Sequence, residues 1–344
     1  MHYFRNFISE MKKRGHQFFI TARDKDCVFQ LLDFYNIPYT SRGKGAKGLA
    51  GKLFYIFKAA MILFRAAQKF KPDLFLSFAS PYAAHAAFLS RKPHIAFDDT
   101  EHAKFEHLMY VPFTQTILTP QPFLKNMGPK QLRFQGFMEL CSLHPKRFSP
   151  DKKILETLNV KSAEEYVLLR FVSWDASHDL GHSGISLHLK MQLVAELKKR
   201  FRVFISAEGN LPPELEPYRI KIKPHQMHNV LAAASLFIGE GATMASECAM
   251  LGTPAIYVNS LDAGTLQEQA NYNLICSFRN SEGVFEKVKE LLAIPNLKNT
   301  WQQKRDKMLS QKIDVTAFMV WFVENYPASL NTLKANPDYQ YNFK

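Results

Sequence analysis

The segment from Ser235 to Val258 constrains the fold of this chain more than any other stretch. It reads as a buried strand, a Gly-Glu-Gly-Ala turn, a short Ala-rich helix, a Gly-Thr-Pro turn and a second buried strand. Such a unit places a helix N-terminus at the carboxyl end of a parallel strand, where backbone N–H groups and the helix dipole suit a phosphate. Gly239 and Gly241 would let the backbone turn sharply and approach a ligand closely.

The same segment contains a carboxylate one turn into the predicted helix. Glu247 lies four residues after Thr243, so its side chain could reach ribose hydroxyls. The alternative is an ordinary strand–turn–helix in which Thr243 or Ser246 lies near the cap and the dipole favours Glu247. The pattern alone leaves both interpretations open.

Strands and helices alternate along most of the chain, which predicts doubly wound parallel sheets. The spacing of apolar residues predicts helices over 2–14, 27–35, 49–70, 81–89, 185–199 and 228–234, and strands over 17–22, 38–40, 73–78, 94–97, 116–120, 166–171, 202–206 and 219–222.

The length of 344 residues exceeds the usual size of a single core. We therefore expect two Rossmann-like domains that face a cleft. Residues 1–145 would form the first, acceptor-side domain, 146–165 a linker, 166–325 the second domain and 326–344 a tail. Chains of this kind usually open with a strand and a glycine-containing loop, whereas here a helix begins almost at Met1. We expect that this first strand is missing.

The net charge of +13 is concentrated near the N-terminus. Between Ser41 and Lys71 there are eight basic residues and no acidic one. An anionic membrane or a polyanionic substrate could explain this, and the chain lacks the motifs that accompany nucleic-acid binding, so we expect no nucleic-acid partner. The helix over 49–70 is either a core helix or a membrane-facing helix with a basic stripe.

The four cysteines lie far apart and show no metal-binding spacing. We therefore predict reduced thiols, no metal site and a cytoplasmic protein, which could lie at the inner face of the membrane. No apolar run reaches the roughly 18 residues of a membrane span.

The sequence Asp98-Asp-Thr-Glu-His102 follows the predicted strand over 94–97. Open α/β sheets bind ligands at this edge, and Asp99, Glu101 and His102 could supply a general acid or base. The alternative is a solvated turn that caps a helix.

Polar groups also follow the strands of the second half. Arg170, Ser173 and His178 are groups suited to a diphosphate. Glu208 is another edge position, and His225 and Met227 lie in a loop that could contact a nucleobase. His228 is predicted as an ordinary residue of a helix start.

Several of these segments resemble one known family. They are Arg-Gly-His at 14–16, Thr-Ala-Arg-Asp at 21–24, Phe-Lys-Pro-Asp at 70–73, Asp-Asp-Thr-Glu-His at 98–102, Ser-Trp-Asp-Ala-Ser-His-Asp at 173–179 and Gly-Glu-Gly-Ala-Thr-Met-Ala-Ser-Glu at 239–247. They resemble the domain-of-unknown-function-354 family, which is counted among GT-B glycosyltransferase-like proteins and is similar to UDP-N-acetylglucosamine 2-epimerase.

The resemblance implies a GT-B-like fold whose second half binds a nucleotide sugar. Gly241, Ala242 and Thr243 would hold the diphosphate, Glu247 the ribose and the loop over 224–227 the base. The 2-epimerases carry a His-x-Glu-Ala segment near the place of residues 100–103, although order and residue types differ here.

Our first hypothesis is a nucleotide-sugar-dependent glycosyltransferase of surface polysaccharide synthesis. A UDP-type donor would be its substrate, with no cofactor, and its acceptor would be lipid-linked or polyanionic. Asp99, Glu101 or His102 would act as base, and Arg170 and His178 would steady the leaving diphosphate. The alternatives are a non-hydrolysing nucleotide-sugar 2-epimerase and a non-catalytic binding protein of the same fold.

Overall fold

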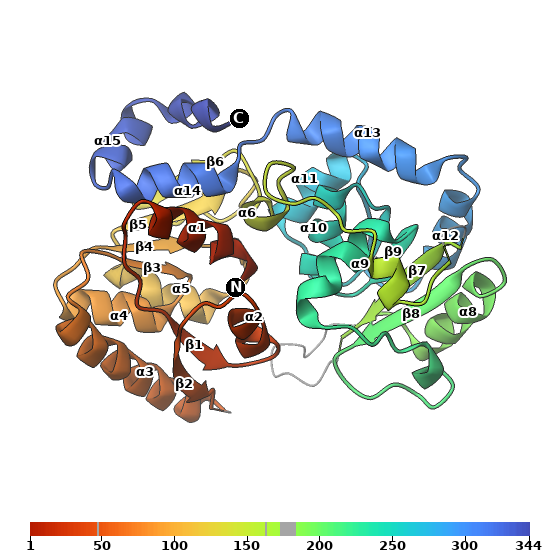
Figure 1. Ribbon diagram of the computed structural model, residues 1–344, viewed down its shortest axis with the longest axis horizontal. Coiled ribbons are helices and arrows are strands. Elements are labelled where there is room, and N and C mark those ends of the chain that lie inside the picture. Colours follow the sequence, from red (N-terminus) through yellow and green to blue (C-terminus); the bar gives the residue numbers. More distant parts are fainter. Residues whose placement is uncertain (47, 162–163, 173–183) are drawn as a thin grey trace. The chain divides into compact units, whose positions relative to one another are not determined.

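The computed structural model describes residues 1–46, 48–161, 164–172 and 184–344. This part of the chain divides into two compact units: unit 1 is Met1–Ser142 with Ile313–Lys344, and unit 2 is Leu143–Lys312. Both units contain parallel sheets and helices (Figure 1), so the predicted α/β class is confirmed.

Unit 1 contains a four-stranded parallel sheet in the order β3-β4-β5-β6 and a two-stranded parallel sheet, β1-β2. The strands are β1 (Thr21–Asp24), β2 (Thr40–Lys44), β3 (Phe75–Phe78), β4 (His94–Phe97), β5 (Thr116–Pro120) and β6 (Gln131–Phe134). The helices are α1 (His2–Lys13), α2 (Val28–Phe34), α3 (Leu49–Phe70), α4 (Pro81–Leu89), α5 (Lys104–Tyr110), α6 (Leu140–Leu143), α14 (Val315–Glu324) and α15 (Ala328–Ala335), with 3-10 turns at Val111–Phe113 and Pro337–Phe343. Every residue of β4 and β5 is buried, as expected for strands covered on both faces.

Unit 2 contains one parallel sheet in the order β11-β10-β9-β7-β8. The strands are β7 (Tyr166–Phe171), β8 (Arg202–Ala207), β9 (Leu236–Gly239), β10 (Ala255–Val258) and β11 (Ile275–Phe278). The helices are α7 (Ile154–Thr157), α8 (Leu187–Leu197), α9 (Met227–Ala233), α10 (Ala242–Leu251), α11 (Gly264–Asn271), α12 (Val284–Leu292) and α13 (Leu297–Leu309), with 3-10 turns at Glu216–Tyr218 and Pro224–Gln226. The chain runs from β7 to β8 and then returns to the other side of β7, so the strand order reverses between β7 and β9.

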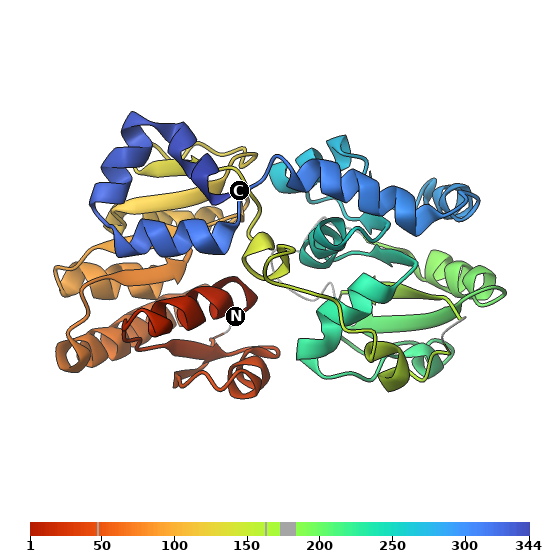
Figure 2. The ribbon, with the colours of Figure 1, turned by 45° about the horizontal axis from the view of Figure 1, so that its top comes forward.

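The C-terminal part of the chain differs from the expected boundaries. Residues 313–325 were expected in the second domain and 326–344 in a tail, but both belong to unit 1. Helix α14 is apolar on several sides, and its Phe318 packs 5.9 Å from Phe134 of β6 (ring centroids), so it covers the unit 1 sheet (Figure 2). Burial of this helix, rather than sequence order, decides where the chain end lies.

Three local predictions also need correction. The described residues of the expected linker over 146–165 belong to unit 2, where α7 packs on α9 and Ile154 is buried. The first strand begins at Thr21 instead of residue 17. The predicted strand over 219–222 is reduced to a single bridge between Arg219 and Ile205.

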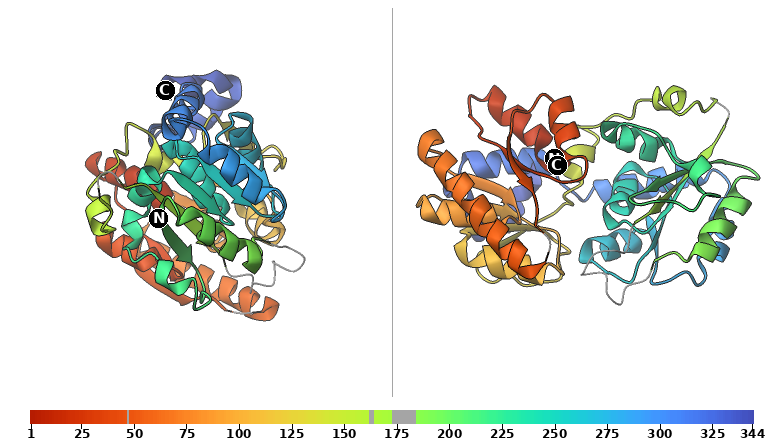
Figure 3. Two further views of the ribbon diagram at one scale, coloured as in Figure 1. Left: turned by 90° about the vertical axis from the view of Figure 1, so that its right-hand side faces the viewer. Right: turned by 90° about the horizontal axis from the view of Figure 1, so that it is seen from below.

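Helix α3 is a core element on one face only. It packs beside α4 (Figure 3), and its small residues Ala59 and Ala60 are buried. On another face Phe54 is 69% exposed, Phe57 66% and Leu53 45%. Among the helices that the structure describes, none combines the length and apolarity needed to cross a membrane.

A fully buried histidine stands at the start of β4. His94 Nε2 lies 2.9 Å from Ser77 Oγ, and its Nδ1 lies 2.8 Å from Thr114 Oγ1. Burial lowers the pKa of His94 to about 3, so the imidazole is neutral in the folded protein.

This burial predicts acid sensitivity of folding. In the unfolded chain His94 would protonate near pH 6.5, whereas the folded state resists protonation, so stability falls as the pH drops from 6.5 towards 3. The contribution is about 2 kcal/mol between pH 7 and pH 5. Denaturant unfolding at both pH values should show this loss in the wild type and a smaller loss in His94→Asn. Equal losses in both proteins would contradict the assignment.

Candidate functional site

The carboxyl edge of the unit 2 sheet is built around the contact between β7 and β9. Arg170 of β7 lies opposite Gly239 of β9 in the strand register. A Cβ atom on Gly239 would lie 2.7 Å from Arg170 Cβ and 2.7 Å from Phe237 Cζ, so only glycine fits there. Because the strand order reverses at this contact, the edge is a topological switch point, the usual ligand site of open α/β sheets.

Helix α10 starts directly at this edge. Its N-cap is Gly241, and no side chain in the described ranges caps it. Ala242 and Thr243 are exposed, so the first-turn amides can face an anion. Thr243 is the second residue of the helix, whereas Ser246 Oγ accepts a 2.7 Å hydrogen bond from Gln269 and lies away from the cap. The interpretation as an ordinary strand–turn–helix therefore stays open beside that of an anion site.

Arg170 presents a guanidinium group at the same edge. It donates to Ser206 Oγ at 2.8 Å and to the carboxylate of Glu208. Glu208 is half exposed, so this ion pair contributes little stability and a ligand anion could compete for the guanidinium. Ser173 and His178 lie outside the described residues.

Glu240 was not predicted as a site residue, yet it organises this edge. Its buried carboxylate accepts hydrogen bonds from the amide of Val172 at 2.8 Å and from the amide of Ile185 at 2.7 Å. Lys190 Nζ lies 3.7 Å from the same carboxylate. Glu240 therefore fastens the end of β7 and the start of the α8 segment to the β9–α10 turn. An acidic residue between two glycines at a strand end was the available clue.

Glu247 lies on the buried side of α10, where it meets a histidine of α9. The distance from His228 Nε2 to Glu247 Oε1 is 3.0 Å, and Phe148 packs edge-on against the imidazole. The prediction of His228 as an ordinary helix-start residue missed this partner.

His225 lies three residues before His228, in the loop that was predicted to contact a nucleobase. Burial and then the charge of Lys223 lower the pKa of its imidazole.

In unit 1 the predicted turn after β4 contains a buried carboxylate network. Asp98 accepts hydrogen bonds from Tyr110 Oη at 2.6 Å, His107 Nε2 at 2.9 Å and the Thr100 amide at 2.9 Å. Lys125 Nζ donates to His107 Nδ1 at 2.7 Å, so the imidazole proton lies on Nε2. The alternative of a solvated turn is therefore wrong for Asp98.

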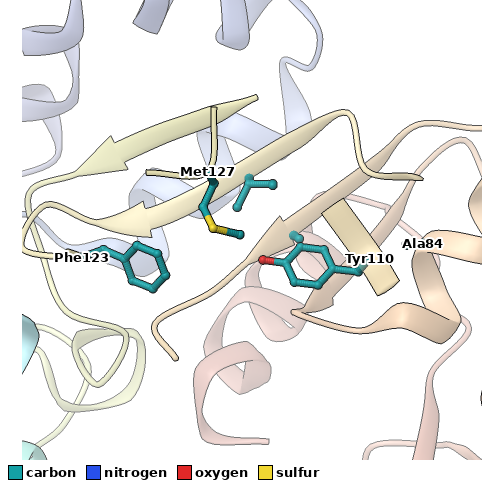
Figure 4. Packing of buried hydrophobic residues seen from close by; sticks show 6 residues of the cluster. Ala84, Tyr110, Phe123 and Met127 are labelled. Atoms are coloured by element: carbon teal, nitrogen blue, oxygen red, sulfur yellow. The ribbon is translucent and has the colours of Figure 1, made fainter. Parts of the chain in front are cut away.

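An apolar cluster supports this network. The ring of Tyr110 packs with Ala84, Phe123 and Met127 (Figure 4), while its hydroxyl reaches Asp98. Burial and the Asp98 charge raise the pKa of the Tyr110 hydroxyl, which keeps it protonated as a donor.

The three predicted acid–base residues of unit 1 differ in environment. Burial, followed by the charge of Asp98, raises the pKa of Asp99 to about 7. Thr100 Oγ1 donates to Asp99 at 3.1 Å and Tyr3 Oη at 3.5 Å. Glu101 accepts from the Leu124 amide at 2.8 Å and anchors a loop. His102 is exposed.

The predicted residues thus fall into two sets, one in each unit. Unit 2 brings Arg170 and Glu208 together at the sheet edge, with Gly241, Ala242 and Thr243 at the helix start and Glu247 paired with His228. Unit 1 holds Asp99, Glu101 and His102 on one turn. In the part of the chain that the structure describes, no three His, Cys, Asp or Glu side chains gather as a metal ion would require.

Comparisons with known proteins concern the family and the fold of this chain. The model of a family described as protein of unknown function (DUF354) matches residues 1–325. An uncharacterized protein of Methanocaldococcus jannaschii is 26% identical over 269 residues, which cover 74% of this chain and 77% of that protein.

Two solved structures share the fold. A UDP-GlcNAc 2-epimerase of Methanocaldococcus jannaschii, in complex with UDP-GlcNAc and UDP, has a TM-score of 0.63 at 13% identity and covers 86% of this chain and 90% of its own. MurG of Acinetobacter baumannii has a TM-score of 0.57 at 16% identity and covers 94% of this chain and 96% of its own. The chain therefore has the GT-B-like fold that the resemblance implied.

Proposed function

The chain belongs to the DUF354 family, and we propose that it is a nucleotide-sugar-dependent glycosyltransferase of cell-surface polysaccharide or glycoconjugate synthesis. One observation carries the proposal: the N-terminus of α10, which no side chain of the described residues caps, opens beside Arg170 at the switch point of the unit 2 sheet. The helix N-terminus and the guanidinium group both favour binding of a diphosphate. The epimerase of similar fold that was solved with UDP-GlcNAc and UDP supports a UDP-type donor.

Each part of the donor has a candidate partner in unit 2. The amides at Gly241–Thr243 and the guanidinium of Arg170 would bind the diphosphate. Glu247, oriented by His228, would accept hydrogen bonds from the ribose. His225 and Met227 would lie against the base, and Glu208 would release Arg170 when the donor binds.

The acid–base residue would come from unit 1. Asp99 has a pKa of about 7, and a base works best when its pKa lies near the working pH. It would take the proton of an acceptor hydroxyl. Glu101 is a weaker candidate because it already holds the Leu124 amide, and His102 would act from the surface of the same turn.

The acceptor would be lipid-linked or polyanionic, which requires a surface that meets a membrane or a polyanion. Helix α3 offers exposed Phe54 and Phe57, and residues 41–71 contain only basic charges. Apolar side chains beside basic ones are typical of helices that lie on anionic membranes. We propose that unit 1 contacts the inner face of the membrane through this helix.

A second candidate function is 2-epimerisation of a nucleotide sugar. The near-neutral pKa of Asp99 suits removal of a proton from a sugar carbon as well as from an acceptor hydroxyl. Incubation with the donor alone separates the two reactions, because epimerisation needs no acceptor and transfer does. A non-catalytic protein would bind the nucleotide and turn over neither.

The donor site predicts stabilisation by UDP. At a ligand concentration of 100 Kd the free energy of unfolding should rise by about 2.7 kcal/mol. Gly241→Ala should fold normally, because its Cβ would lie 3.8 Å from Arg170 Cγ at an ordinary negative φ, yet it should lose UDP binding through contact with the diphosphate. Thermal melts with and without UDP measure both effects.

Arg170→Gln should weaken UDP binding at least tenfold, because it removes a charge-assisted contact. Arg202→Gln is the matched control: Arg202 also pairs with a glutamate, but it lies at the amino end of β8. Equal losses in the two variants, or no stabilisation of the wild type by UDP, would contradict the donor site.

Asp99→Asn should retain UDP binding and lose turnover at least a hundredfold, whether turnover is transfer or epimerisation. In the wild type, turnover should rise with pH through about 7 as Asp99 loses its proton. The pKa of Asp99 is higher in the folded protein than in the unfolded chain, so protonated Asp99 stabilises the folded state. This stabilisation is lost as the pH rises to 7. Asp99→Asn should therefore be more stable than the wild type at pH 8. Unchanged turnover would remove Asp99 from the mechanism.

Membrane contact through α3 predicts binding to vesicles of phosphatidylglycerol and phosphatidylcholine. Phe54→Ser should reduce sedimentation with these vesicles roughly tenfold, since a fully buried Phe is worth about 1.5–3 kcal/mol. Leu108→Ser is the control, because Leu108 is 75% exposed on α5, outside this helix. A similar reduction in both variants would argue against a specific role of α3.

A further inference from the structure

Two arginines lie side by side on the small sheet of unit 1. Ala22 of β1 is paired with Ser41 of β2, which places the next residues, Arg23 and Arg42, beside each other. The register then shifts, so that Asp24 is paired with Lys44. Two residues of β2, Arg42 and Gly43, therefore stand against the single Arg23 of β1, and Gly43 has a φ of +71°. Bulges of this kind redirect side chains near functional sites.

Two nitrogens of the Arg42 guanidinium group are buried. Its Nε and Nη1 are inaccessible to solvent and have no partner among the described residues. Its Cζ lies 4.7 Å from the ring centroid of Tyr82, which offers only the face of an aromatic ring. Buried N–H groups without an acceptor are costly, and this cost is greater for a charged group.

Arg23 increases the positive charge at the same place. A Cβ on Gly45 would lie 3.1 Å from Arg23 Nη1, so the guanidinium rests directly on the glycine backbone. Burial first, then the neighbouring charge of Arg23, lowers the pKa of Arg42. The remaining titratable groups that act on Arg42 are Tyr55 and Tyr82, so in the described part of the chain no carboxylate balances it.

We propose that Arg23 and Arg42 bind a phosphate or diphosphate group in unit 1, with Tyr82 supporting the Arg42 guanidinium. Planar guanidinium groups match phosphate oxygens in pairs, and an anion would supply the missing acceptors and offset the repulsion between the two cations. The proposal is argued from residues of unit 1 alone and does not rest on the nucleotide site proposed for unit 2. Its ligand would be a phosphorylated molecule.

The test follows pyrophosphate binding to the full chain in thermal melts, with Arg170→Gln present throughout to weaken the anion site of unit 2. We expect pyrophosphate to raise the Tm in this background. Arg42→Gln and Arg23→Gln should each lower the apparent affinity at least tenfold. Arg65→Gln should leave it unchanged, because Arg65 is an exposed cation of α3 with the same charge.

The melt without ligand gives a second readout. Arg42→Gln should keep or raise this Tm, because it removes buried N–H groups that have no acceptor. A lower Tm with unchanged pyrophosphate affinity would assign Arg42 to the fold and overturn the proposal. Equal losses of affinity in Arg42→Gln and Arg65→Gln would also overturn it, since net charge alone would then explain binding.

The phosphate could belong to a soluble ester or to a lipid headgroup. A second arm therefore measures sedimentation with phosphatidylcholine vesicles that contain phosphatidic acid. Loss of vesicle binding in Arg42→Gln, with competition by pyrophosphate in the parent protein, would assign the site to a headgroup. Loss of pyrophosphate affinity alone would assign it to a soluble ester. Loss of neither would show that the proposal is wrong.

Discussion

The buried carboxylate of Glu240 holds the carboxyl edge of unit 2 together. Its oxygens accept amide hydrogen bonds from Val172 and Ile185, and its own carbonyl accepts from Asn259 at 3.0 Å. A buried charge is tolerated only when such partners replace water. Because Glu240 lies between Gly239 and Gly241, the same turn that receives these bonds also places Arg170 beside the start of α10. The geometry of the edge that we propose binds phosphate therefore depends on this carboxylate, although Glu240 need not touch a ligand.

Unit 1 uses the same physical solution at the corresponding edge of its sheet. Asp98 follows β4 directly, is fully buried and accepts from Tyr110, His107 and the Thr100 amide. These donors satisfy its oxygens, and after burial its charge is the next cause that raises the pKa of its neighbour Asp99. The hydrogen bonds of the protein thus satisfy the carboxylate of Asp98, while the pKa of Asp99 lies near neutral pH. Two neighbouring carboxylates with such different environments are typical of acid–base sites.

The sequence predicted what local patterns determine. The strands over 94–97 and 166–171 and the helix over 49–70 were found because their apolar runs and boundaries are encoded in place. Contacts between distant residues could not be read in this way. The pairing of Glu247 with His228 requires α9 to pack on α10, and the return of α14 to unit 1 depends on Phe318 meeting Phe134. The strand β6 was missed because its alternation of polar and apolar residues spans only four positions, Gln131–Phe134.

Buried polar groups in this protein fall into two classes, and the difference separates fold from function. His94 is fully buried, Lys298 is partly buried, and both have partners. Lys298 Nζ donates to the Ala234 carbonyl at 2.9 Å and to Thr253 Oγ1, and burial lowers its pKa to about 7. These groups stabilise the fold and need nothing more. Among the described residues, two buried nitrogens of Arg42 have no acceptor and α10 begins without a side-chain cap. Binding of an anion at each of these two places would supply the missing partners, which is the physical basis of both binding proposals.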